Sequence, residues 1–208
     1  MIANMSAKSS DIKVISEKIT RHAWAECDDL FDPELTGQLF REALQHEAEH
    51  SLKLASVGHN EGKTLSSLRG DSTLWLDDAR CGEASKSFLL ALEALRESLS
   101  RSMMLGLETV EAHFAVYPEG AAYARHRDRF RDDDLRILSL VCYLNADWPD
   151  DAGGAIRLHL DEGMHDIQPR MGTSIIFLSE EMDHEVLPST QTRYSIAAWF
   201  HRREIQLR

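Results

Sequence analysis

The first strongly patterned stretch of the chain has the spacing of an amphipathic helix. In segment 34–54, Leu35 and Leu39 recur on one face, and charged side chains fill the other. Asp32 and Pro33 form a typical helix start, because aspartate accepts hydrogen bonds from free N–H groups and proline is tolerated at the first helical position. We therefore predict a helix that begins here and buries its leucine face.

A second stretch, residues 83–105, repeats large apolar side chains every three or four residues. This spacing predicts a helix with one buried face, and Gly106 suits the cap just beyond its end. We interpret the stripe as core rather than as a cofactor-binding motif. Its members are Leu89, Leu92, Leu95, Leu99 and Met103.

From Glu111 the pattern changes to short β-type runs that are separated by turn residues. Many short strands with turn signals predict a sandwich or a barrel. An earlier run, which starts at His22, predicts a first strand before the first helix. The runs expected as strands in the C-terminal half are 111–117, 122–128, 136–144, 155–160, 173–178, 183–187 and 193–201.

Composition narrows the class of protein. A chain of 208 residues can bury a core, and we expect one domain. The net charge of −12 argues against a broad nucleic-acid surface, so we expect no nucleic-acid partner. The three cysteines form no C-x-x-C motif and indicate neither a disulfide framework nor a zinc ribbon. We find no secretory signal and no apolar run of membrane-span length, and therefore expect a cytoplasmic protein with no membrane partner.

His126, Asp128 and His184 have the make-up of a metal site. Residues i and i+2 of a strand point to the same side, so His126 and Asp128 can reach one ion from one strand end. His184 must come from a distant strand that folds back alongside. Two imidazoles and one carboxylate, with open positions on the metal, are typical of non-haem Fe(II) oxygenases. The alternating arginines of segment 125–131 are expected to point the other way, towards the acidic run 132–134.

Two further residues suit the binding of a carboxylate beside such an ion. Arg193 lies nine positions after His184 on a segment that reads as a strand, and its guanidinium can bind a carboxylate in a bidentate way. Tyr143, on an earlier strand, can add a phenolic hydrogen bond. Together they would hold the far carboxylate of a co-substrate whose other end chelates the metal. Taken singly, Arg193 could equally form a surface ion pair, and Tyr143 could be a core aromatic.

The first predicted helix contains a rival metal motif. His46, Glu47 and His50 match H-E-x-x-H, which on a helix places both histidines on one side, as in zinc proteases. A protease would also need a third ligand and a cleft. The surrounding charges are typical of a solvated helix face, and we favour that interpretation.

The stretch from residue 113 to residue 199 resembles the 2-oxoglutarate- and Fe(II)-dependent oxygenases. More narrowly, it is similar to the prolyl 4-hydroxylase branch that includes the hypoxia-factor prolyl hydroxylases and their bacterial relatives. An upstream motif extends the resemblance to most of the chain, from about residue 23. The motifs are L-R-G-D-x-x-x-W-L at 68–76, Y-P-x-G at 117–120, H-R-D at 126–128, Y-L-N-x-D-W at 143–148, Gly153 with Gly154, P-x-x-G at 169–172, H-E-V-x-P at 184–188 and R-Y-S-I-x-x-W at 193–199.

The resemblance implies an α+β, mainly β fold, with a double-stranded β-helix (jelly-roll) core braced by N-terminal helices. Residues 1–208 would form a single oxygenase domain. Within it, residues 1–20 are expected to be flexible or to form a short helix, and residues 21–110 to provide helical support and a substrate loop. Residues 111–201 would form the jelly-roll catalytic core. The loop is placed at 55–67 by position alone.

The resemblance also implies a dioxygenase that hydroxylates a prolyl residue in a protein substrate and produces succinate and CO2. Fe(II) would be bound by His126, Asp128 and His184, and 2-oxoglutarate by Arg193 and Tyr143. O2 would be the oxidant, with ascorbate as an accessory reductant. By position in the family, the substrate would contact Tyr117, Arg136, Ile156, Trp199, Arg69 and Asp71.

Other functions fit parts of the same pattern. For Arg69 and Asp71, a turn closed by an ion pair is as good an interpretation as a substrate contact. A translation factor is the protein partner that the bacterial relatives suggest. The alternatives are a small-molecule hydroxylase acting on a free amino acid or a peptide natural product, and a non-catalytic sensor of oxygen or 2-oxoglutarate. A nucleic-acid demethylase shares the chemistry, but the acidic charge argues against it.

Overall fold

The computed structural model describes residues 9–55, 68–128 and 135–203. The helices are α1 (Ser9–His22), α2 (Pro33–Ala48) and α3 (Glu83–Met103), and none of them, within these residues, has the length and hydropathy of a membrane span. The strands are β1 (Trp24–Asp28), β2 (Lys53–Leu54), β3 (Ser72–Trp75), β4 (Leu107–Tyr117), β5 (Tyr123–His126), β6 (Arg136–Tyr143), β7 (Ile156–Leu160), β8 (Gly163–Ile167), β9 (Thr173–Leu178), β10 (His184–Val186) and β11 (Arg193–Arg202).

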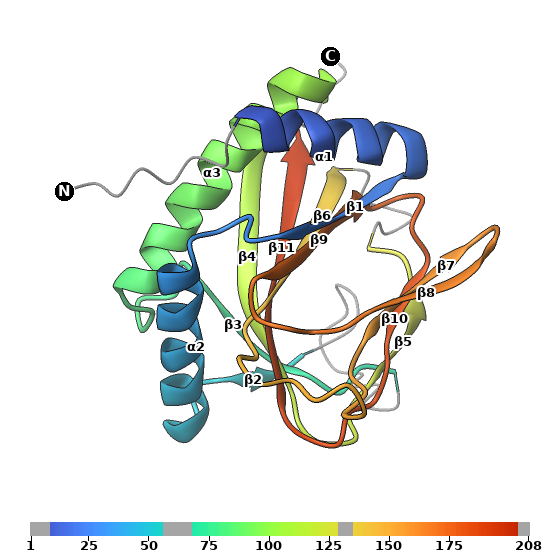
Figure 1. Cartoon of the computed structure of the whole chain (residues 1–208). Coiled ribbons are helices and arrows are strands. Elements are labelled where there is room, and N and C mark those ends of the chain that lie inside the picture. The colour runs from blue at the N-terminus through green and yellow to red at the C-terminus, as the bar shows by residue number, and fades with distance from the viewer. Residues whose placement is uncertain (1–8, 56–67, 129–134, 204–208) are drawn as a thin grey trace, which may run out of the picture.

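The strands form two antiparallel sheets (Figure 1). The larger sheet has the order β1-β9-β6-β11-β4-β3-β2, and the smaller has the order β5-β10-β7-β8. The strand pattern left a sandwich and a barrel open, and the described strands form two separate sheets rather than a closed barrel. Each run predicted in the C-terminal half corresponds to a strand. Strands β2, β3 and β8 were not predicted, because they are short and β8 contains glycine and aspartate, which are poor strand formers.

Alternation along the larger sheet separates two faces. Every second side chain of β4 and β11 packs with the three helices in the main hydrophobic core, and Figure 1 shows the helices on this outer side. The intervening side chains line a cavity on the other face. On β11 the helix side holds Tyr194, Ile196, Ala198 and Phe200, and the cavity side holds Arg193, Ser195, Ala197 and Trp199.

Helix α2 starts as predicted and ends earlier than predicted. The Asp32 side chain accepts a hydrogen bond from the Glu34 N–H at 2.8 Å, which satisfies one free donor of the first turn. Leu39 is fully buried on the predicted face. The helix ends at Ala48, and His50, with a φ of 52°, turns the chain towards β2.

Helix α3 buries most of the predicted stripe but has a different cap. Leu92, Leu95 and Leu99 are buried, whereas Leu89 and Met103 are only partly buried. Met104, rather than Gly106, adopts the left-handed conformation that ends the helix, with a φ of 54°, and its N–H donates to the Ser100 carbonyl. The predicted cap is therefore two residues too late.

Of the two interpretations of residues 1–20, a flexible segment or a short helix, the structure shows a helix for residues 9–20, which belong to α1. Ile12, Ile15 and Ile19 recur on one face of this helix and are buried in the main core. The apolar stripe is narrow and the rest of the helix is polar, so hydrophobic composition alone did not reveal it. The first eight residues lie outside the described part of the chain.

Truncation of Ile19 tests the docking of α1. Because its side chain is fully buried, Ile19→Ala is expected to lower the free energy of unfolding by about 2–5 kcal/mol in a denaturant titration. Val14 lies on the same helix but is 50% exposed, so Val14→Ala is the matched control and should change stability by less than about 0.5 kcal/mol. Equal losses in the two variants would show that α1 does not pack in this way.

Candidate metal centre

Two strands of the smaller sheet bring the three predicted metal ligands together. His126 ends β5 and pairs with His184, the first residue of β10, and Asp128 follows two positions after His126. The ligand atoms of the three residues all lie within 4.8 Å of one another. Asp128 Oδ1 is 3.5 Å from His126 Nε2 and 3.8 Å from His184 Nε2. Donors of this kind around one point can hold a divalent metal ion and leave further coordination positions open.

Hydrogen bonds to backbone carbonyls fix the tautomers of both imidazoles. His126 Nδ1 lies 2.8 Å from the Ala124 carbonyl oxygen, and His184 Nδ1 lies 3.1 Å from the Met182 carbonyl oxygen. A carbonyl can only accept, so in each neutral ring Nδ1 carries the hydrogen and Nε2 keeps its lone pair. This is the arrangement in which a histidine binds a metal through Nε2.

Electrostatics favour the metal-binding forms of the buried groups. Burial opposes ionisation of Asp128, but the positive charge that His184 and His126 carry when protonated outweighs it and holds the carboxyl pKa well below its ordinary value. Burial lowers the pKa of His184, and the Asp128 charge opposes that shift only in part. An ionised aspartate and a neutral histidine are the forms that bind metal.

Two arginines brace the strands that carry the ligands. Arg125 and Arg127 both donate to Asp183, at 2.7 and 2.9 Å, and so tie β5 to the residue that precedes His184. The acidic run 132–134, which was predicted to receive these arginines, lies outside the described residues.

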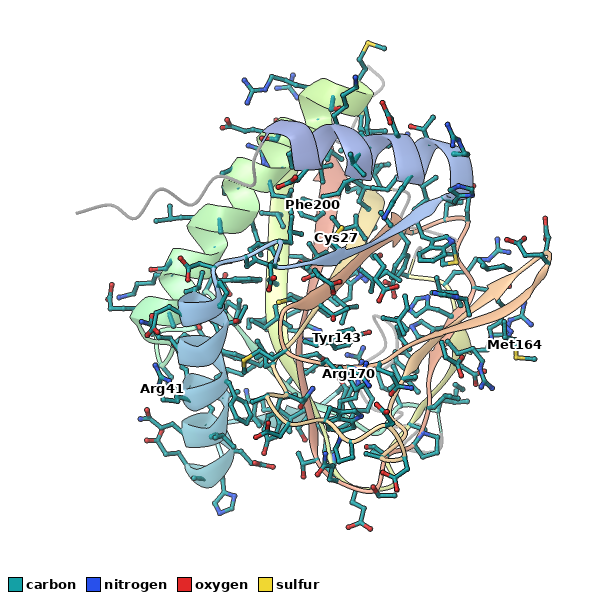
Figure 2. The ribbon with its side chains drawn as sticks, viewed as in Figure 1. Cys27, Arg41, Tyr143, Met164, Arg170 and Phe200 are labelled. Carbon is teal, nitrogen blue, oxygen red and sulfur yellow. The ribbon has the colours of Figure 1, made fainter. Side chains whose placement is uncertain are left out.

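Arg193 and Tyr143 form a buried polar pair with unsatisfied donors. Arg193 is 2% exposed, and its guanidinium lies 5.0 Å from the centre of the Tyr143 ring and 5.1 Å from that of Tyr117. Its Nη1 donates to Ser195 Oγ at 3.2 Å, but its Nε and the Tyr143 hydroxyl have no hydrogen-bond partner among the described residues. Burial raises the pKa of Tyr143 to about 12, so its hydroxyl stays a donor. Tyr143 is labelled in the interior in Figure 2.

This arrangement favours the binding of an anionic ligand. A buried cation without a partner is costly, because it loses its hydration and gains no compensating charge. Arg193 forms no ion pair with any carboxylate in the part of the chain that the structure describes. The far carboxylate of a dicarboxylic acid would supply both the missing charge and acceptors for the unpartnered donors.

A cavity of about 200 Å³ joins the metal ligands to Arg193 and is lined from both sheets. The predicted substrate loop would border this region by position, but residues 56–67 lie outside the described chain. A larger groove, of about 660 Å³, lies between α1, α3 and the segment after β1, and no predicted site residue lines it. Of the six residues predicted to contact substrate, those that line the smaller cavity are Tyr117, Arg136, Ile156, Trp199 and Arg69.

Asp71 is the sixth, and its predicted substrate contact is corrected by its burial. The side chain is fully buried and accepts hydrogen bonds from Arg69 Nε and Nη2 at 2.6 and 2.9 Å. Of the two interpretations, the structure shows the turn closed by an ion pair. Asp71 therefore positions Arg69, whose guanidinium lies 5.0 Å from the centre of the Tyr123 ring.

His113 belongs to no motif in the sequence and is buried on the cavity side of β4. Its ring packs against Trp75 and Trp199, with centroid distances of 5.1 and 5.2 Å, and its Nδ1 lies 2.9 Å from the Phe114 carbonyl oxygen. Burial, reinforced by the charge of Arg69, lowers the pKa of His113 to about 4. The available signal was its even spacing from Tyr117 on one strand, which places both on the same face.

We expect His113 to make the fold sensitive to acid between about pH 6.5 and 4. In this window the unfolded chain binds more protons than the folded protein, so the free energy of unfolding falls as the pH falls. A pKa lowered from 6.5 to about 4 corresponds to a loss of roughly 3 kcal/mol. Denaturant titrations across this range should show a smaller loss for His113→Gln than for the unmodified protein. Parallel pH profiles would contradict the assignment.

The rival H-E-x-x-H motif does not assemble. Helix α2 ends at Ala48, so His50 lies beyond it and is exposed, whereas His46 is buried. Glu47 accepts a hydrogen bond from the Tyr194 hydroxyl instead of facing a metal. The solvated-face interpretation is thus right for His50 and wrong for His46.

Comparison with known proteins places this geometry among oxygenases. The family model of the 2OG-Fe(II) oxygenase superfamily matches residues 112–201. A prolyl-4-hydroxylase from Pseudomonas putida, solved by crystallography, is 36% identical with a TM-score of 0.85, and the match covers 92% of this chain and 99% of that chain. The predicted jelly-roll core with N-terminal helices is thereby confirmed.

Two further relatives extend the comparison. Human prolyl hydroxylase EGLN3 is 33% identical over 153 residues, which are 69% of this chain. This chain spans only 63% of the length of that relative. A prolyl hydroxylase from Trichoplax adhaerens, solved in complex with a hypoxia inducible factor peptide fragment, is 21% identical, has a TM-score of 0.85 and covers 93% of this chain and 90% of its own. At this low identity, the similarity supports the fold alone.

Proposed function

Because this chain belongs to the prolyl hydroxylase family of the 2OG-Fe(II) oxygenases, we propose that it hydroxylates a prolyl residue in a protein substrate and releases succinate and CO2. One observation carries the proposal beyond family membership. The His126, Asp128 and His184 cluster lines the same cavity as the buried Arg193, which forms no ion pair with any described carboxylate. A metal site and a carboxylate site side by side are what a chelating 2-oxo dicarboxylic acid requires.

The family uses Fe(II), 2-oxoglutarate and O2, and the residues present fit them. His126 and His184 would bind the iron through Nε2 and Asp128 through its carboxylate, in the protonation states already described. When bound, iron and 2-oxoglutarate supply the oxidising power that inserts oxygen into a C–H bond. Affinity alone does not select iron over zinc at such a site, so the assignment of iron rests on the family and on a two-histidine, one-carboxylate set with open positions.

The side chains of this protein then orient the reactants and exclude water. Arg193 and the Tyr143 hydroxyl would hold the far carboxylate of 2-oxoglutarate, which fixes its 2-oxo acid end towards the metal ligands. The burial of Arg193 and His184 keeps bulk water from this path. Ser195 steadies the guanidinium by accepting from Nη1.

The cavity would accept the target proline of an extended peptide. Tyr117, Ile156 and Trp199 line it and provide apolar surface for a pyrrolidine ring. Arg136 lies 4.1 Å from the centre of the Trp199 ring and donates to Glu111 at 2.8 Å. Guanidinium groups at the cavity can donate to peptide carbonyls on either side of the proline. A protein substrate is supported by the names of the relatives, one of which was solved with a peptide fragment of hypoxia inducible factor. Translation factors are one class of protein to search first.

The test combines purified protein with Fe(II), 2-oxoglutarate, isotopically heavy O2 and a lysate of the host. We expect succinate and one heavy oxygen on a proline of a single protein. Both should be lost with His126→Ala and kept with His165→Ala, because His165 lies on the hairpin of β7 and β8 and outside the triad.

Other outcomes discriminate between the alternatives. Succinate without a labelled peptide would overturn the protein substrate and favour a small amino acid or a peptide natural product. Absence of succinate from iron-loaded protein would overturn the enzymatic proposal and leave a sensor that acts by binding.

A further inference from the structure

A second cluster of metal-ligand side chains lies on the helix side of the larger sheet. Glu42 and His46 are one turn apart on α2, and Cys81 lies in the segment just before α3. The three ligand atoms lie within 4.8 Å of one another, and His46 Nε2 is 3.7 Å from Glu42 Oε1. None of the three lines the cavity of the oxygenase site.

His46 is the part of this cluster that needs an explanation. The residue is 3% exposed, and neither ring nitrogen has a hydrogen-bond partner among the described residues. Buried polar groups in folded proteins nearly always have such a partner, because they lose their bonds to water on folding. The ring packs against Phe114 of β4, at a centroid distance of 5.9 Å, which holds it in place without satisfying a nitrogen. Both ring nitrogens are therefore available to bind a ligand at this point.

Glu42 is held rigidly in position to share such a ligand. Its Oε1 accepts hydrogen bonds from the Gly82 N–H and the Ser85 hydroxyl, both at 2.6 Å, and its Oε2 accepts from the Ser85 N–H at 3.3 Å. These bonds cap the start of α3, where Gly82 offers no side chain of its own. A carboxylate has about four acceptor sites, so capacity remains for a metal.

Cys81 supplies a sulfur that is buried and otherwise weakly bound. Its thiol donates to the Trp75 carbonyl at 3.3 Å, and the residue is 7% exposed. Burial raises the pKa of Cys81 to about 11, so without a metal the thiol stays protonated. A coordinating metal would displace that proton.

We propose that Glu42, His46 and Cys81 form a second metal site, for Zn(II), that is separate from the oxygenase centre. Carboxylate oxygen, imidazole nitrogen and thiolate sulfur are the three donors that zinc takes in proteins, and water would complete four-coordination. The thiolate distinguishes this site from the iron ligands in metal preference. A bound zinc would fasten α2 to the start of α3 behind β4. The site stands independently of the proposed hydroxylase activity.

Cobalt titration tests the site in the full-length Asp128→Ala protein, in which the oxygenase triad is incomplete. Under reducing conditions and with Co(II) alone as the probe, we expect one equivalent to bind with a thiolate-to-cobalt charge-transfer band and release of one proton. Zn(II) should displace the cobalt and remove the band, since it binds such sites more tightly. Zn(II) should also raise the melting temperature, because only the folded chain holds the three donors together.

Variants in the same background decide the assignment. Cys81→Ser should abolish the band, whereas Cys27→Ser, at a half-buried cysteine on β1 (Figure 2), should keep it. His46→Gln leaves the thiol in place and should weaken Co(II) binding by at least about tenfold. A band that survives Cys81→Ser, an unchanged affinity in His46→Gln, or no charge-transfer band in the parent protein would each overturn the proposal. The His46 result applies even if Cys81→Ser does not fold.

Discussion

Asp128→Ala is expected to abolish succinate formation from 2-oxoglutarate and to weaken Fe(II) binding by well over about 100-fold, since the loss of mere supporting residues around a metal already costs 10- to 100-fold. The reason is geometric and electrostatic. Asp128 Oδ1 lies within 4 Å of the Nε2 atoms of both His126 and His184 and provides the only negative charge of the triad. Anaerobic Fe(II) titration and a succinate assay measure the two effects.

The matched control is another carboxylate of the smaller sheet. Asp166 on β8 pairs with Arg157 of β7 at 2.7 Å and takes no part in the triad, so Asp166→Ala should keep both iron binding and turnover. Tight iron binding by Asp128→Ala, or equal losses in the two variants, would show that Asp128 is not an iron ligand.

The metal centre was predictable because strand geometry and motif agree there. The spacing of His126 and Asp128 matches the period of a strand and predicted that both side chains reach one point. In the structure β5 ends at His126 and Asp128 lies two positions beyond it, yet the two side chains still meet. His184 could be added because its motif lies at a fixed distance before Arg193. His184 reaches this point because β10 pairs with β5, which places His184 opposite His126.

The second cluster was not predictable by the same means. His46 lies among charged residues, and this pattern predicts an exposed position. Its burial results from the packing of α2 against β4, which only the tertiary structure shows. Cys81 is a single cysteine far along the chain, and only the tertiary fold brings it to Glu42. Contacts between residues that share no strand, helix or motif leave no local pattern. The same holds for Asp183, which receives Arg125 across a strand pair.

Arg193→Met is expected to weaken the binding of 2-oxoglutarate and to raise the stability of the ligand-free protein. The guanidinium is buried without an anion, so removing it takes away the main charge for the far carboxylate of 2-oxoglutarate. The expected loss of binding free energy is about 2–5 kcal/mol, or roughly 30- to several-thousand-fold in affinity. In the ligand-free protein the same change should not destabilise and is expected to stabilise by about 1–4 kcal/mol, because a buried charge is replaced by an apolar chain of similar length.

Calorimetric titration with 2-oxoglutarate in the Mn(II)-loaded protein and denaturant unfolding of the metal-free protein measure the two sides. Arg157→Met, at an arginine on β7 that is ion-paired with Asp166 and lies outside the cavity, is the matched control and should leave 2-oxoglutarate affinity unchanged. Loss of stability in Arg193→Met with unchanged affinity would mean that the guanidinium is satisfied within the fold. Weaker 2-oxoglutarate binding together with higher stability in Arg193→Met would show that Arg193 is kept for the carboxylate of the ligand. The protein would then be less stable without its ligand because it buries this charge.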